Sequence, residues 1–232
     1  MPKLKHHMSK DDSLKQNVAQ AALEQIEEHV RTHKQMVLGI GTGSTVNYLI
    51  DLLDHKAHQF HAIVASSKAT HTRLMQRGFT PTDPNQVSSI DLYVDGMDEI
   101  NPHKQMIKGG GGALTGEKIL AAMADQFIAI GDQSKLVDCL GNFPVAIEVL
   151  ATARSFVARK MVIMGGEPLY RTGFITDHGH LILDVYHLPL EEPGRMEQEI
   201  NQMPGVVANG IFSQRRADKA FISSGQDTIR SW

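Results

Sequence analysis

The chain has 232 residues, of which 41% are hydrophobic and 21% are charged, as is typical of a globular protein with a sizeable core. Its formal net charge of −3 excludes the positive excess that binds nucleic acid or an anionic membrane surface. No apolar run approaches the ~20 residues of a membrane span, and residues 1–8 lack the apolar segment of a signal peptide. Because Cys139 is the only cysteine, the chain cannot form an internal disulfide. We expect a cytoplasmic protein in which Cys139 is packed and inert.

Helices and short apolar strands alternate in the first part of the chain. The expected strands are 36–40, 61–65, 90–94 and 127–130, and the expected helices are 13–30, 46–53, 68–76 and 115–124. Such alternation favours an α/β fold, an open and mostly parallel sheet with helices on both faces. In sheets of this kind, ligands bind at the carboxyl ends of the strands.

The pattern changes near Pro144. The expected strands are now 146–149, 169–176, 180–186 and 206–212, with helices at 151–164 and 197–203. Asp177-His178-Gly179 indicates a hairpin turn. This β-α-β-β-α-β order predicts an inserted ferredoxin-like α+β domain. We therefore divide the chain into a catalytic α/β domain, residues 1–143 and 214–232, and a smaller domain, residues 144–213, with a last strand at 220–223 returning to the first sheet.

Four consecutive glycines, Gly109 to Gly112, are the most informative feature of the sequence. Ordering four glycines on folding costs backbone entropy, and packing alone does not require such a run. The run therefore indicates a backbone that approaches a ligand closely. Lys108 precedes the run, and Glu117 follows in the first turn of an expected helix.

Glu117 is the candidate base. A glutamate can abstract a proton from a carbon beside a carbonyl, and a pKa raised by burial would improve the match to neutral pH. The helix N-terminus would lower the pKa instead, and the sequence leaves open which effect wins. Lys108 would stabilise a developing oxyanion, with help from the glycine amides. The alternative is that Glu117 is a surface residue paired with a neighbour.

The segment Gly41-Thr42-Gly43-Ser44-Thr45 joins a strand to a helix and forms a candidate phosphate site from backbone N–H groups and hydroxyls. It lacks the lysine of the P-loop, and Ser44 and Val46 stand where the dinucleotide fingerprint needs glycine. A phosphate monoester is the better match. The alternative is a structural turn that caps the helix.

Three further positions are weaker candidates. Ser66-Ser67-Lys68 follows another strand and either lines the same cleft or only caps a helix. Lys15 and Lys135 are candidate phosphate ligands, although lone lysines are usually solvated.

Asp95, Asp98 and Glu99 form an acidic cluster after the strand 90–94. None of the twelve histidines falls at a metal-ligand spacing near these acids, so we expect no metal, although magnesium needs only carboxylates and water. The alternatives are hydrogen bonding to sugar hydroxyls with proton transfer, or plain solvation and helix capping.

These motifs, taken together, resemble the ribose-5-phosphate isomerase family, type A. The resemblance rests on residues 39–45, 93–100 and 108–118, with support from 151–155, 176–180 and 203–207, and it covers about residues 12 to 225. Met97, Gly112 and Lys68 depart from the family pattern, where alanine, alanine and an acidic residue are common.

The resemblance implies interconversion of D-ribose 5-phosphate and D-ribulose 5-phosphate through an enediolate, without cofactor, in a cytoplasmic homodimer or dimer of dimers. By this resemblance Glu117 is the base, and Lys108, Asp95 and Asp98 are the other catalytic residues. The substrate-binding positions implied are Lys15, Thr42, Gly43, Ser44, Thr45, Asp95, Gly96, Met97, Asp98, Lys108, Gly109, Gly110, Gly111 and Lys135. Two alternatives are a sugar-phosphate-sensing domain without turnover and a CoA transferase-like enzyme with Glu117 as nucleophile.

Overall fold

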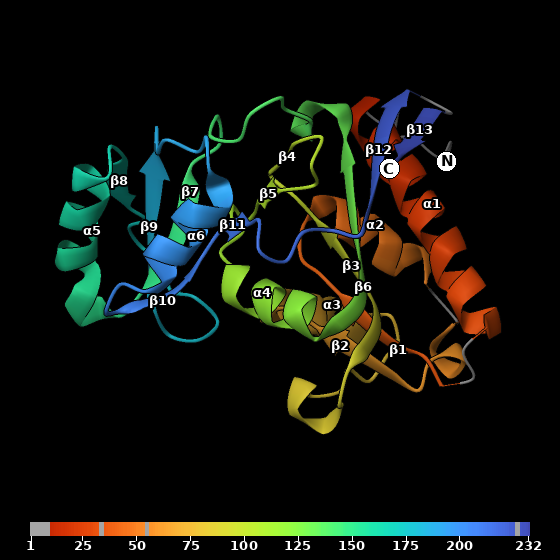
Figure 1. Cartoon of the computed structure of the whole chain (residues 1–232). Coiled ribbons are helices and arrows are strands. Elements are labelled where there is room, and N and C mark those ends of the chain that lie inside the picture. The colour runs from red at the N-terminus through yellow and green to blue at the C-terminus, as the bar shows by residue number, and fades with distance from the viewer. Residues whose placement is uncertain (1–9, 33–34, 54–55, 226–227) are drawn as a thin grey trace, which may run out of the picture.

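A six-stranded sheet forms the larger part of the molecule (Figure 1). The computed structural model describes residues 10–32, 35–53, 56–225 and 228–232, so the expectation for residues 1–8 lies outside it. The strand order is β13-β12-β6-β3-β1-β2, and all neighbours are parallel except β12 and β13. The strands are β1 Val37–Ile40, β2 Ala62–Ala65, β3 Ile90–Gly96, β6 Ala124–Asp132, β12 Lys219–Gly225 and β13 Thr228–Ser231.

Helices cover both faces of this sheet, as the sequence predicted. One apolar layer joins the sheet to α1 (Lys10–Thr32), α2 (Ser44–Leu52) and α3 (Lys68–Gln76), and α4 (Leu114–Met123) packs on the other face. On that second face, the Tyr93 and Phe127 rings of neighbouring strands lie 5.0 Å apart between centroids. Both rings are fully buried, so the layer under α4 excludes water.

Residues 145–209 form a second, antiparallel sheet with strand order β10-β7-β9-β8. Its elements are β7 Val145–Val149, α5 Arg154–Ile163, β8 Glu167–Tyr170, β9 Leu181–Tyr186, α6 Pro193–Asn201 and β10 Val206–Asn209. This order and connectivity are the expected ferredoxin-like arrangement. The division into two domains at residues 144 and 213 remains our interpretation of it.

A third, three-stranded sheet was not predicted. It contains β4 (Glu99–Ile100), β5 (Met106–Ile107) and β11 (Ile211–Phe212) in the order β11-β5-β4. Helix α4 lies between the two larger sheets, in contact with β3 and β6 on one side and β7 and β10 on the other (Figure 1). The first turn of α4 therefore sits where the two parts of the chain meet.

Two expectations for the second part of the chain were wrong. The strand expected at 169–176 ends at Tyr170, because Arg171 turns away to contact the carbonyl oxygens of Gly109 and Gly110. The strand expected at 206–212 breaks at Gly210, whose N–H donates to Ala146 O while its carbonyl accepts from Lys108 N–H. Contacts between residues distant in the chain, which local patterns do not report, decide both breaks.

Cys139, expected to be packed, is exposed. Among the helices of the described residues, none combines the length and the apolar character needed to cross a bilayer.

Candidate functional site

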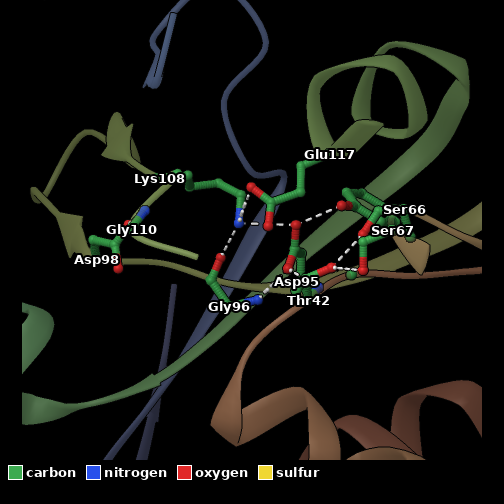
Figure 2. A network of polar contacts seen from close by, with 12 residues as sticks. Thr42, Ser66, Ser67, Asp95, Gly96, Asp98, Lys108, Gly110 and Glu117 are labelled. Carbon is green, nitrogen blue, oxygen red and sulfur yellow. Dashed lines mark hydrogen bonds and ion pairs between the residues drawn. The ribbon is translucent and has the colours of Figure 1, made fainter. Parts of the chain in front are cut away.

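The carboxyl ends of β1, β2 and β3 meet, as the parallel sheet predicted, and Thr42 joins them. The Thr42 hydroxyl lies 2.9 Å from Ser66 Oγ and 2.7 Å from Ser67 Oγ. The Thr42 N–H donates to Asp95 Oδ1 at 2.9 Å. Three chain segments that are distant in sequence are thereby held in one polar network (Figure 2).

Lys108 is a buried ammonium between two carboxylates (Figure 2). Its Nζ lies 2.8 Å from Asp95 Oδ2 and 3.3 Å from Glu117 Oε2, and it donates to the Gly96 carbonyl oxygen at 2.5 Å. Burial alone would lower the pKa of Lys108, but Asp95 and Glu117 outweigh it and raise this pKa above its usual range. Lys108 therefore keeps its positive charge at neutral pH.

Glu117 lies in the first turn of α4 with its carboxylate directed at Lys108 (Figure 2). Only 4% of the residue is exposed. Burial raises the pKa of Glu117 to about 8, against the opposing effect of the Lys108 charge. Burial, the largest effect on this pKa, therefore favours the protonated form of Glu117, and the carboxyl can take up and release a proton near neutral pH.

Asp95 is fully buried and has all its lone pairs engaged. Its Oδ1 accepts from the N–H groups of Thr42 and Gly96, and its Oδ2 accepts from the Tyr93 hydroxyl and from Lys108. Four donors of this kind stabilise an ionised carboxylate in the interior. Asp95 therefore acts as a fixed negative charge behind Lys108.

A cavity of about 300 Å³ opens in front of Lys108 and Glu117. Of the predicted residues, all except Asp95 and Gly110 line it. The lining residues are Asp11, Lys15, Thr42, Gly43, Ser44, Thr45, Gly96, Met97, Asp98, Lys108, Gly109, Gly111, Glu117, Asp132, Ser134 and Lys135. A cavity of this size with many polar walls fits a small, polar ligand.

Sequence reasoning missed three of the lining residues. Asp132 ends β6, the fourth parallel strand to end at this edge, and Ser134 lies just after it; the position of that strand was itself predicted. Asp11 lies one helical turn before Lys15, and its carboxylate is 2.6 Å from Lys15 Nζ. The rule that ligands bind at the carboxyl ends of strands would have identified the first two.

The glycine run forms one wall of the cavity. Gly109 and Gly112 have φ angles of 103° and 79°, which side-chain-bearing residues rarely adopt. The Gly110 N–H donates to Asp98 Oδ2 at 2.8 Å. Asp98, which lines the cavity, thereby also holds the loop in place.

Two of the remaining candidates, Ser67 and Glu99, make structural contacts and do not line the cavity. Ser67 caps α3 by accepting from the Thr70 N–H, so the capping interpretation of this loop is confirmed. Glu99 accepts from the N–H groups of Gly141 and Phe143, and it does not line the cavity. Within the described residues, no three His, Cys, Asp or Glu side chains gather as a metal site would require.

The arrangement has the parts needed for proton transfer on an anionic substrate. It has one buried carboxyl with a raised pKa, one permanent cation 3.3 Å from it, and two lysines with a hydroxyl-rich helix N-terminus along the same cavity.

Comparisons with known proteins agree with this chemistry. A family model described as ribose 5-phosphate isomerase A (phosphoriboisomerase A) matches residues 62–227. Ribose-5-phosphate isomerase A of Legionella pneumophila (strain Lens) is 52% identical over 211 residues, which cover 91% of this chain and 95% of the relative.

Solved structures of similar proteins have the same fold. Ribose 5-phosphate isomerase A from Neisseria gonorrhoeae has a TM-score of 0.87 at 36% identity, covering 97% of this chain and 98% of the other. A D-ribose-5-phosphate isomerase in complex with phospho-erythronic acid has a TM-score of 0.88 at 33% identity, covering 97% of this chain and 99% of the other.

The raised pKa of Glu117 leads to a direct prediction. In protein labelled with ¹³C at the glutamate carboxyl carbons, one resonance should titrate with a midpoint near pH 8, because burial disfavours the charged form. That resonance should be absent from Glu117→Gln. Exposed glutamates, which titrate near ~4.3, serve as internal controls. A Glu117 midpoint in that ordinary range would contradict the prediction.

Proposed function

The chain belongs to the ribose 5-phosphate isomerase A family, and we propose that Glu117 is the base with which it interconverts D-ribose 5-phosphate and D-ribulose 5-phosphate. The protein is an intramolecular aldose–ketose isomerase of the non-oxidative pentose phosphate pathway. One observation carries the assignment of the base: the Glu117 carboxylate, with its raised pKa, reaches the cavity 3.3 Å from the Lys108 ammonium.

The proposed reaction begins with the open-chain aldose. The Glu117 carboxylate removes the proton from C2, and the electron pair moves through C1 to the carbonyl oxygen. The Lys108 ammonium stabilises the negative charge that develops on this oxygen. The protonated Glu117 then delivers its proton to C1, while the hydroxyl proton on O2 moves to O1, and the ketose results.

Asp98 and Asp95 have different proposed roles. Asp98 lines the cavity, so we assign to it the transfer of hydroxyl protons between the sugar oxygens and assistance in ring opening. Asp95 does not line the cavity and acts through Lys108, whose position and charge it fixes at 2.8 Å. These steps need only side chains of this chain.

The phosphate end of the substrate is proposed to lie along Thr42 to Thr45, Lys15 and Lys135. The backbone of residues 43–45 forms the N-terminus of α2, where free N–H groups and the helix dipole favour an anion. Phospho-erythronic acid, present in one of the similar structures, is a phosphorylated sugar acid that supports this class of ligand. Contacts at the distant phosphate orient the reacting carbons against Glu117.

We also propose that the chain forms a homodimer or dimer of dimers through the smaller domain. Among the described residues, the large apolar side chains that are exposed lie between positions 150 and 207, except for Met75 and Ile119. Ile163, for example, is 77% exposed. A cytoplasmic location, the compartment we propose, would keep the exposed Cys139 reduced.

Replacement of the base tests the proposed function. Glu117→Gln should leave the fold intact and lower kcat by roughly 10²–10⁴, the range for loss of a general base. The assay follows ketose formation from ribose 5-phosphate by NMR in D₂O, and wild type should place deuterium at C1 of the ketose or C2 of the aldose. Glu24→Gln, an exposed change on α1, should behave as wild type. Near-normal turnover by folded Glu117→Gln would remove the assignment.

Loss of one phosphate ligand should separate binding from chemistry. Lys135→Ala is expected to raise KM about tenfold or more with a smaller change in kcat, because its contact is made in both the ground and the transition state. The matched control is Lys68→Ala, an exposed lysine at a neighbouring strand end that does not line the cavity. An unchanged KM with a collapsed kcat would contradict the phosphate role.

The oligomer is tested by light scattering after size exclusion. A mass of two or four times the chain mass of 25.6 kDa is expected. Ile163→Glu, which places a charge among the exposed apolar side chains, should lower that mass. A monomer at assay concentrations in the wild type would rule out the proposal.

A further inference from the structure

Glu148 is a buried carboxylate that the isomerisation mechanism does not use. It lies in β7 with 0% exposure. Its Oε2 accepts from the Thr115 hydroxyl at 2.5 Å, and its Oε1 accepts from the Thr176 hydroxyl at 2.8 Å and lies 2.8 Å from His180 Nδ1. A charge buried to this extent is costly unless it is hydrogen-bonded, so these contacts keep Glu148 in one position.

Thr115 connects this carboxylate to the active site. It lies in the first turn of α4, two residues before Glu117. Through Thr115 this turn contacts Glu148 of the second sheet, and through Glu117 it lines the cavity. One helical turn therefore connects the second sheet to the cavity. On a rigid helix, a displacement of residue 115 also moves residue 117.

The neighbours of Glu117 are held on other sides as well. The backbone of Gly116 packs against the Ser66 carbonyl so closely that a Cβ has no room. Lys118 Nζ lies 2.5 Å from Glu197 Oε1 and donates to Ile211 O at 2.6 Å. Each residue next to Glu117 therefore contacts a different element, and Thr115–Glu148 is a hydrogen bond from α4 to β7.

We propose that the Thr115–Glu148 hydrogen bond is a positioning contact for catalysis, which sets the distance from Glu117 to Lys108 and to the reacting carbons. The inference rests on the proposed role of Glu117 as the base. Proton transfer depends steeply on this distance, and a misplacement of about 1 Å can cost on the order of 10²-fold in rate. The phosphate contacts come from α1, α2 and the segment after β6, so substrate binding does not depend on this hydrogen bond.

Thr115→Val tests the proposal, because valine keeps the shape and removes the hydroxyl. It leaves Oε2 of Glu148 without its donor, so α4 should shift at its first turn. The expected result is a kcat lowered by about tenfold with KM within about twofold. Thr115→Ser, which restores the hydroxyl, should recover most of the lost kcat.

Thr176→Val is the matched control. It also removes one hydroxyl donor from Glu148, but Thr176 is not on α4, and His180 remains 2.8 Å from the same oxygen. Its kcat should stay close to that of wild type even where its melting temperature falls. Circular dichroism and thermal melts establish that each variant is folded at the assay temperature.

Several results would overturn the proposal. These are a normal kcat in folded Thr115→Val, no recovery in Thr115→Ser, or an equal loss of kcat in Thr176→Val. Failure of the proposed function gives a different pattern, because Glu117→Gln would then keep its turnover whatever Thr115 does.

Discussion

The rest of the site depends on one interaction, the buried Lys108 ammonium between the carboxylates of Asp95 and Glu117. Three largely buried charges at short range interact strongly, and removal of one partner from a buried ion pair typically costs about 3–5 kcal/mol. The arrangement holds one net negative charge when both carboxylates are ionised. Since Asp95 is stabilised by four donors and Glu117 is not, the proton that relieves this charge goes to Glu117.

That asymmetry explains how two chemically similar side chains differ in function. Asp95 lies at the end of a central strand, where the N–H groups of Thr42 and Gly96 and the Tyr93 hydroxyl converge on it. Glu117 comes from a helix, and among the described residues its Oε2, which lies 3.3 Å from Lys108 Nζ, has no hydrogen-bond donor. A carboxyl with few donors and little water is easily protonated, as a base that must also return its proton requires.

Helix α4 connects the proposed base, Glu117, to the second part of the chain. The helix carries Glu117 on the side of the cavity, while Thr115 and Lys118 contact Glu148 and Glu197 of the second part of the chain. Arg171, also from that part, contacts the carbonyl oxygens of Gly109 and Gly110 in the cavity wall. The second sheet thus supports the base and the glycine run from behind, although it contributes no residue to the cavity wall.

The sequence by itself determined the alternation of strands and helices, the ferredoxin-like order after Pro144 and the strand ends where the cavity lies, because these follow from local apolar periodicity and turn residues. It also placed Lys108 and Glu117 close together in the chain, since only the glycine run and the four residues after it separate them. Only the tertiary structure decided that burial raises the pKa of Glu117, that Asp95 lies behind Lys108, and that Glu99 contacts another loop. It likewise ended the strands at Tyr170 and Asn209. These outcomes depend on water exclusion and on partners distant in the chain, which no local pattern of residues records.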